Sequence, residues 1–338
     1  MKSSSQSALH QQESRSGMTI VEVLVCLGII SLLMALVMPA VQSGRELSRR
    51  AACLNNLKQL GLATTEFESA HGVFPGFSNA RLPTSPLRPN ESIHQKLLPF
   101  LDQLALSRLL DAEDRSSPTA EPPSVSPANL RGLQIKLAVF SCPTDNVPAG
   151  ATSYRASTGT SPGLFSQFQG QAPGGALQGF VMGGGLSAAR VRDGMSQTVF
   201  FTEKLIGDGN TATFHAPTDV VIGGCEPRCS TADEAEAACR SVTAVRDHAS
   251  YGGRTWLLSS HSYTFYNHIL TPNSPIPDCS TPVSLVVQGA YTARSLHPGG
   301  VNVVCGDGSC RFVASGIDRN VWRAIGTIDA SETIAWPE

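Results

Sequence analysis

The sequence predicts an α+β chain in which one long N-terminal helix packs on an antiparallel β-sheet with a large, loop-rich insertion. Three observations predict it. An apolar run from Ile20 to Met38 has the length of a membrane-spanning helix. An apolar period of three and four residues then continues this helix to about Ala70. The chain also has 31 glycines, 22 prolines and several short β-branched runs, which indicate a turn-rich β domain.

The apolar run is expected to be a retained anchor. Its ionisable side chains are Glu22 and Cys26, and its nineteen residues rise about 28 Å as a helix, close to a bilayer core. A secretory signal peptide has a shorter apolar core and a small-residue cleavage site, and Met38-Pro39-Ala40-Val41 is a poor site. We therefore expect a membrane span over residues 18–41, preceded by a cytoplasmic leader over residues 1–17.

The helix should continue beyond the span, with a kink at Pro39. Its apolar or small residues recur on one face, at Leu47, Ala51, Leu54, Leu57, Gly61, Thr64 and Phe67. Gly72 supplies a C-terminal stop. The soluble part of the helix is expected over residues 42–72, and its apolar face should pack on a globular domain over residues 73–338.

Several elements of the globular domain are predicted from pattern alone. Leucines at helical spacing predict a helix over Ile93–Leu110. The segment Cys225–Asp247 is expected to be an insertion that disulfides hold together. Short strands are expected at Leu137–Phe140, Val199–Thr202, Val283–Val287 and Val301–Val304.

The C-terminal hairpin has the strongest turn signal. Asp307-Gly308 lies between two alternating strands and is typical of a two-residue type I′ turn. With this loop, Cys305 opposes Cys310 in a non-hydrogen-bonded pair, where side chains approach closely and a cross-strand disulfide fits.

Cysteine usage and charge limit the compartment and the partners. The chain has nine cysteines, of which Cys26 lies in the span. The other eight are an even number, which indicates disulfides in an oxidising compartment beyond the anchor. The formal net charge of −2 gives no indication of a nucleic-acid partner.

The head of the span, Gly17-Met18-Thr19-Ile20-Val21-Glu22-Val23-Leu24, resembles the processing site of type IV prepilins and pseudopilins. The resemblance implies that a prepilin peptidase cuts after Gly17 and methylates Met18, which stands in place of the family's phenylalanine. It also implies that Glu22 pairs with the N-terminal amine of a neighbouring subunit. Such a pair would offset the cost of a carboxylate in the membrane.

The processing motif also sets the orientation. Arg45, Arg49 and Arg50 follow the span and outnumber Lys2 and Arg15 in the leader, so the positive-inside rule opposes a cytoplasmic leader. We follow the motif. The expected protein is a single-pass protein of the cytoplasmic (inner) membrane whose C-terminal domain is periplasmic or extracellular.

Further stretches resemble a family of prepilin-like proteins of unknown function that is abundant in planctomycetes. They are Arg49–Gly61, Phe140–Asp145, Val191–Thr198 leading to Glu203, and His297-Pro298-Gly299-Gly300 with Asp307-Gly308 nine intervening residues after His297. The resemblance runs from residue 17 to about 328 and implies a pilin-like fold with no established activity. It departs at Gln197, where the family usually has asparagine, and at the cysteines after Cys142.

The same resemblance bears on the disulfides. Cys53 and Cys142 lie in shared motifs, which implies that they pair and tie the helix to the sheet. Two further bonds are then expected among Cys225, Cys229, Cys239 and Cys279, and three pairings are open.

Few residues suggest a catalytic or metal-binding site. His297 and Asp307 suggest a metal site or a general base, but a turn and a hairpin tip favour structural roles. Calcium on Asp307 and Asp318 is the one cofactor left open, and it lacks EF-hand spacing. The C-x3-C-x9-C-x8-H series of Cys225, Cys229, Cys239 and His248 fits no common zinc spacing, and no metal is expected there.

We expect function by assembly and no enzymatic activity, because the chain has neither a phosphate-binding loop nor a Gly-x-Ser-x-Gly elbow. The product would be a filament, a secretion-type machine or a cell-surface structure built with like or related pilin-type subunits. The alternative is a membrane-anchored extracytoplasmic module that binds a ligand such as a carbohydrate.

Overall fold

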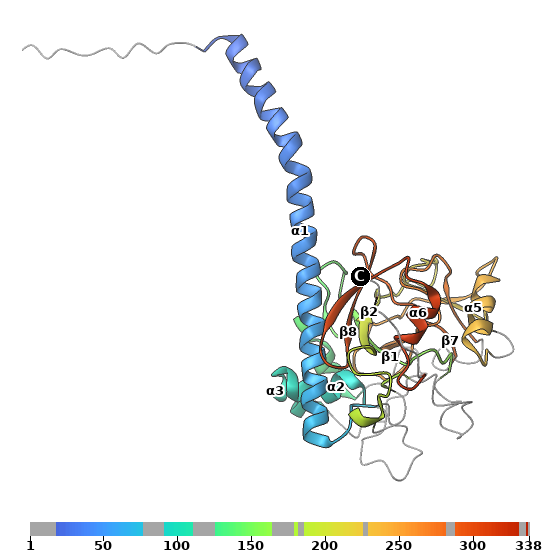
Figure 1. Ribbon diagram of the computed structural model, residues 1–338. Coiled ribbons are helices and arrows are strands. Elements are labelled where there is room, and N and C mark those ends of the chain that lie inside the picture. The colour runs from blue at the N-terminus through green and yellow to red at the C-terminus, as the bar shows by residue number, and fades with distance from the viewer. Residues whose placement is uncertain are drawn as a thin grey trace, which may run out of the picture. The chain divides into compact units, whose positions relative to one another are not determined.

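The computed structural model describes residues 18–76, 91–110, 126–163, 179–181, 186–225, 229–281, 288–330 and 336. The chain divides after Ser48 into two compact units, and each is described by itself. Figure 1 shows the order of the elements along the chain. The leader and the predicted strand Val283–Val287 lie outside the described residues.

Helix α1 runs from Ile20 to His71 with Pro39 inside it, close to the predicted limits of Met18 and Ala70. Among the described residues it is the one helix with the length and composition to cross a membrane. Every residue from Met18 to Arg45 is exposed. Nothing within the described chain covers this apolar surface.

The second unit contains the last turns of α1, several short helices and two sheets. The helices are α2 (Ile93–Leu97), η1 (Leu98–Leu101), α3 (Leu104–Leu109), α4 (Pro127–Leu133), η2 (Ala138–Phe140), η4 (Ala188–Arg190), α5 (Ala232–Arg240) and α6 (Arg319–Ala324). The strands are β1 (Tyr154–Ser157), β2 (Val199–Glu203), β3 (Val220–Ile222), β4 (His248–Ala249), β5 (Phe265–Tyr266), β6 (Asp278–Ser280), β7 (Gly289–Ala290), β8 (Gly300–Cys305) and β9 (Cys310–Ala314).

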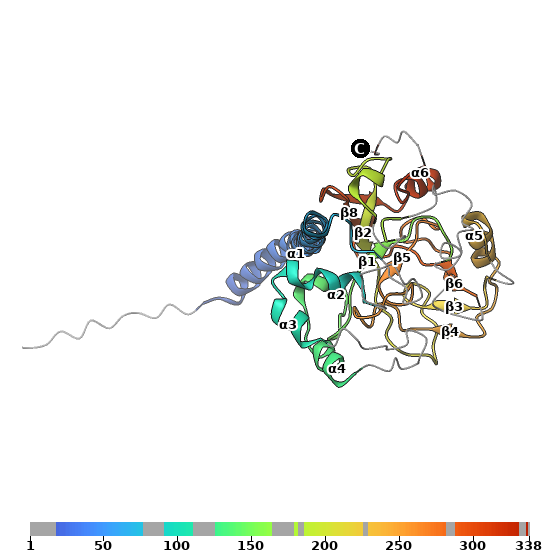
Figure 2. The ribbon, with the colours of Figure 1, turned by 90° about the horizontal axis from the view of Figure 1, so that it is seen from below.

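The first sheet has five strands in the order β5-β1-β2-β8-β9. Its pairs are antiparallel except for β1 and β5, which are parallel. The second sheet has four strands in the order β4-β3-β6-β7, and β3 and β6 are parallel. The predicted single antiparallel sheet is therefore two mixed sheets (Figure 2).

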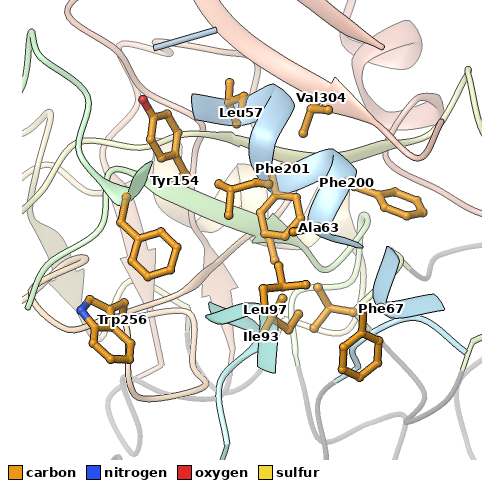
Figure 3. Close-up of a cluster of buried hydrophobic side chains, with 14 of the residues drawn as sticks. Leu57, Ala63, Phe67, Ile93, Leu97, Tyr154, Phe200, Phe201, Trp256 and Val304 are labelled. Atoms are coloured by element: carbon orange, nitrogen blue, oxygen red, sulfur yellow. The ribbon is translucent and has the colours of Figure 1, made fainter. Parts of the chain in front are cut away.

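The five-stranded sheet has a hydrophobic cluster on each face. Because side chains alternate along a strand, Val304 of β8 faces α1, while Val303 and Cys305 join the second cluster with Trp322 of α6. Figure 3 shows the first cluster, which contains Leu57, Ala63 and Phe67 of α1 together with Phe200 and Phe201 of β2.

The face of α1 that packs on the sheet begins later than predicted. Leu47 and Ala51 are exposed, whereas the buried positions are Cys53, Leu57, Leu60, Gly61, Ala63, Thr64 and Phe67. The three- and four-residue period is confirmed from Cys53 onward. Gly61 allows a close approach of α1 to the hairpin, since a Cβ there would lie 2.7 Å from Val304 Cγ2 and 3.2 Å from Gly308 Cα.

Two predicted elements of the second unit differ from the structure. The helix predicted over Ile93–Leu110 is broken at Asp102, which adopts a left-handed backbone with φ of 57° and ends η1. Leu137–Phe140 is not a strand, because Ala138–Phe140 forms a 3₁₀ turn in which Ser141 N–H donates to Ala138 O. The predicted strands at Val199 and Val301 are confirmed by β2 and β8.

The hairpin of β8 and β9 has a three-residue loop rather than the predicted two-residue loop. Cys305 N–H donates to Ser309 O and Gly308 N–H donates to Cys305 O, while Gly308 has φ of 79°. This is a turn closed by a left-handed glycine and a bulge. The register therefore places Cys310 opposite Val304 instead of Cys305.

Candidate functional site

The N-terminal motif caps the first turn of helix α1. Thr19 N–H and Thr19 Oγ1 donate to Glu22 Oε2 at 2.8 and 2.9 Å, and Glu22 N–H donates to Thr19 Oγ1 at 3.3 Å. This reciprocal pattern is a capping box, in which each side chain satisfies the other's free N–H. The sequence reasoning missed this role for Glu22, although a threonine three residues before a glutamate is its signal. Met18 is exposed, and Gly17 lies outside the described residues.

A second constellation joins residues that are far apart in the chain. Cys53 of α1, Cys142 after η2, Glu203 at the end of β2 and His297 before β8 are all buried. One ligand-type atom from each lies within 4.8 Å of those of the other three. Each of these four residues comes from a different one of the four sequence motifs in the second unit, so the motifs meet at one point in the fold.

The distances within this cluster are short. Cys53 and Cys142 form a disulfide whose Cα atoms are 5.1 Å apart, the pairing that the resemblance implied. His297 Nε2 lies 3.3 Å from Glu203 Oε1 and 3.6 Å from Cys142 Sγ. Glu203 Oε1 lies 3.9 Å from the same sulfur. We call these four residues the Cys–Glu–His cluster.

Neighbouring residues fix the members of the cluster. Asn302 of β8 donates to Glu203 twice, from its backbone N–H to Oε2 and from Nδ2 to Oε1, each at 2.9 Å. Cys142 N–H donates to Ser153 Oγ at 3.2 Å, and His297 N–H donates to Ser295 Oγ at 3.0 Å. The Glu203 carboxylate is therefore held by the neighbouring strand, and the backbone at His297 is held by its adjoining turn.

The polar residues of the shared motifs support the surrounding backbone. Asn56 Nδ2 donates to Ala138 O, Ser141 O and the Tyr154 hydroxyl at 3.0 to 3.2 Å. These bonds hold the segment that leads to Cys142. Burial raises the pKa of Asp145, against the opposing effect of hydrogen bonds from the Ser153 hydroxyl and the Ile206 N–H.

A buried charge network adjoins the cluster. Lys204, the residue after Glu203, donates to Asp278 of β6, and Arg294 donates to the other carboxylate oxygen of Asp278 at 3.1 Å. Burial lowers the pKa of Lys204 to about 7. Burial would raise the pKa of Asp278, but Lys204 and Arg294 outweigh that effect and hold it below its ordinary value.

A small pocket opens beside the cluster. Cys142, Glu203, Lys204 and Arg294 are among its lining residues. The pocket therefore lies between the cluster and the buried charge network.

The other predicted site residues have structural contacts. His297 packs against Glu203, whereas Asp307 Oδ1 accepts from Ser309 N–H and Oγ at the hairpin loop, so the two motif residues act in different places. Asp318 caps α6 by accepting from Asn320 N–H and Val321 N–H. These contacts account for both aspartates that we considered as calcium ligands.

The predicted cross-strand disulfide is wrong, because Cys305 and Cys310 are free thiols on opposite faces of the hairpin. A one-residue change of register reverses the face of a side chain, which explains the separation. Burial raises the pKa of both thiols to about 11.

The structure shows which of the three possible pairings the cysteines at 225, 229, 239 and 279 adopt. Cys225 pairs with Cys229, and Cys239 of α5 pairs with Cys279 of β6. His248 Nε2 lies 3.5 Å from Asp219 Oδ2 instead of joining these sulfurs. In this arrangement the four cysteines form two disulfides.

The resemblance implied the pairing of Cys53 with Cys142, but sequence reasoning did not bring His297 or Glu203 to them, and it gave Glu203 and Asn302 no role. A polar pair buried on adjacent strands is visible only once the register of β2 and β8 is known.

Comparisons with known proteins agree with the second resemblance. The model of a family described as "Protein of unknown function (DUF1559)" matches residues 42–320. No curated protein and no solved structure matches the chain.

Proposed function

Because the chain belongs to the DUF1559 family and also carries an exposed apolar N-terminal helix, we propose that it is a membrane-anchored pilin-like protein. In this proposal it is processed after Gly17, is methylated at Met18 and acts by assembly rather than by catalysis. Its partners are prepilin peptidase and like or related pilin-type subunits. The site of action is the cytoplasmic membrane, with the second unit on its outer side.

The observation that carries the proposal is the uncovered surface of α1. Residues 18–45 are exposed throughout, although large apolar side chains such as Leu24, Leu33 and Leu36 fill this stretch. Apolar surface of this extent is stable in a bilayer or against other apolar helices. A pilin-type assembly supplies both environments, the bilayer before assembly and neighbouring helices after it.

Glu22 supports assembly in a more specific way. Its Oε2 atom takes part in the capping box with Thr19, as described above. A new amine on Met18, generated by cleavage, would bring a positive charge to a neighbouring subunit's Glu22 during docking. Charge pairing there would offset the cost of placing a carboxylate among apolar helices.

The two roles of Glu22 can be separated by mutation. Glu22→Gln keeps a capping-box residue at this position but removes the negative charge. Thr19→Ala keeps the charge but removes the capping hydroxyl. Under the proposal, Glu22→Gln is inserted in the membrane and processed yet fails to assemble. Thr19→Ala assembles, with at most a modest loss.

The measurement combines two readouts in cells that contain a prepilin peptidase. Mass spectrometry of the purified protein should find methylated Met18 at the N-terminus, and cross-linking in membranes should find multimers for the wild type and Thr19→Ala. An intact Met1, or equal cross-linking of Glu22→Gln and wild type, would contradict the proposal.

A further inference from the structure

The Cys–Glu–His cluster combines the ligand types that transition metals prefer. Two cysteine sulfurs, one imidazole nitrogen and one carboxylate oxygen converge from four different elements. Among the described residues, no other group of three or more Cys, His, Asp and Glu has ligand atoms this close together. All four residues are at most 4% exposed.

The three separations among His297, Glu203 and Cys142 are close to the edges of a tetrahedral metal site. With metal bonds of about 2.3 Å to sulfur, 2.05 Å to nitrogen and 2.1 Å to oxygen, a tetrahedron has edges of about 3.4 Å from nitrogen to oxygen and about 3.6 Å from sulfur to either. The structure has 3.3 Å between His297 and Glu203, 3.6 Å between His297 and Cys142, and 3.9 Å between Glu203 and Cys142. These three edges already have nearly tetrahedral lengths.

The ligand atom of Cys53 lies within 4.8 Å of those of the other three residues, and its bond to Cys142 does not fit a tetrahedral site. In a tetrahedral site two thiolates lie about 3.8 Å apart, whereas Cys53 and Cys142 are covalently joined. Reduction removes that bond and supplies two thiols. We propose that reduction of the Cys53–Cys142 disulfide converts the Cys–Glu–His cluster into a tetrahedral site for a divalent transition metal of the zinc class.

The conversion has two balanced steps. A dithiol reductant transfers two electrons and two protons to the disulfide, so the S–S bond breaks, Cys53 and Cys142 become thiols and the reductant becomes a disulfide. The divalent ion then displaces the two thiol protons and binds both thiolates, His297 Nε2 and Glu203 Oε1. The protein therefore holds α1 to the sheet through a disulfide when oxidised and through the metal when reduced.

Groups around the cluster fit this role. Asn302 holds the Glu203 carboxylate with two hydrogen bonds at 2.9 Å, and metal-binding carboxylates are commonly oriented by such hydrogen bonds. The Thr144 hydroxyl lies 2.9 Å from Cys142 Sγ and can donate to a metal-bound thiolate. Cys142 and Glu203 line the pocket beside the cluster, which gives a reductant or an ion a side from which to approach.

Cobalt(II) is a direct probe, because thiolate-bound cobalt absorbs where free cobalt does not. The full-length protein is reduced anaerobically with a water-soluble trialkylphosphine, which takes its oxygen from water, and is freed of reductant before titration. The expected result is a sulfur-to-cobalt charge-transfer band that saturates at one equivalent and is displaced by zinc. The oxidised protein should give no such band.

Matched cysteine variants assign the signal, because reduction also frees the cysteines of the inserted region. Cys142→Ser should abolish the band, while Cys279→Ser should keep it. His297→Ala should weaken cobalt affinity more than about 100-fold, and Asn302→Ala about 10- to 100-fold. A band that survives Cys142→Ser, or that is lost in Cys279→Ser alone, overturns the proposal.

A structural readout avoids dependence on variants that fail to fold. X-ray absorption at the zinc edge of the reduced, zinc-loaded wild type should give two sulfur neighbours at about 2.3 Å and two nitrogen or oxygen neighbours at about 2.0 to 2.1 Å. A four-sulfur shell would place the ion on the inserted cysteines and contradict the assignment. Absence of bound zinc after reduction would contradict it equally.

Discussion

Gly61 of α1 lies directly against Val304 of β8, where the helix approaches the hairpin. A Cβ on Gly61 would lie 2.7 Å from Val304 Cγ2, a methyl group of a buried, β-branched side chain. The same Cβ would lie 3.2 Å from Gly308 Cα, which belongs to the backbone of the loop. Neither neighbour can move away without disturbing the hairpin or the cluster beneath it.

We therefore expect Gly61→Val to destabilise the second unit by about 1–3 kcal/mol, the usual cost of overpacking a core. Gly61→Ala should also destabilise it, even though alanine is favoured over glycine in a helix by about 1 kcal/mol. Urea unfolding followed by circular dichroism measures both. Ala52→Val, at an exposed position on the same helix, is the control, and an equal loss there would contradict the packing argument.

The three free thiols can be counted directly. The structure joins six cysteines in three disulfides and leaves Cys26, Cys305 and Cys310 free. Alkylation of the denatured, non-reduced protein should therefore label three cysteines in a peptide map. Labelling of Cys26 alone would restore the two-residue turn and the Cys305–Cys310 disulfide that the sequence suggested.

Asp278 neutralises two buried cations, so its replacement should lower the free energy of unfolding strongly. In Asp278→Asn, Lys204 and Arg294 lose their shared carboxylate in the interior. Breaking a buried pair on one side typically costs about 3–5 kcal/mol. Thermal unfolding measures the change. Asp233→Asn is the control, because the Asp233 side chain is exposed where it pairs with Arg323, and its loss should change stability little.

Acid should destabilise the protein through three buried histidines. Burial is the largest effect on each, and it lowers the pKa of His94 to about 4 and of His261 and His268 to about 3. Below the ordinary histidine value of about 6.5, the unfolded chain therefore binds protons that the folded chain refuses. The stability is fully present above about pH 6.5 and falls as the pH drops toward these values.

The expected slope is up to about 1.4 kcal/mol per pH unit for each histidine. Urea unfolding between pH 7 and 4.5 measures it. His261→Gln should lower the slope by the contribution of one histidine, up to about 1.4 kcal/mol per pH unit. His215→Gln, in an exposed loop, should leave the slope unchanged. A free energy of unfolding that is flat across this range would refute the assignment.

Local sequence patterns predicted a helix or strand correctly where a single periodic pattern was strong. The apolar period gives α1 within two residues at each end, and alternation gives β2 and β8. The hairpin loop is different, because Gly306-Asp307-Gly308 is compatible with a two-residue or a three-residue loop. Packing of Cys305 with Trp322 on one face and of Cys310 near Leu54 on the other decides between them.

The cluster was beyond sequence reasoning for a different reason. His297 and Glu203 approach each other only because β2 pairs with β8, and Cys142 joins them through a segment that Asn56 holds. Pairings of this kind depend on long-range register, which no local period encodes. The second sheet escaped prediction similarly, since its strands have only two or three residues each.

The Cys53–Cys142 disulfide joins positions 89 residues apart and so closes a large covalent ring. A protease that cuts one peptide bond inside this ring produces two chains, but the apolar N-terminal helix remains attached to the rest of the second unit. Release from the helix then requires the cut and a reductant together. A single cleavage between Cys53 and Cys142 therefore does not release the second unit from the N-terminal helix.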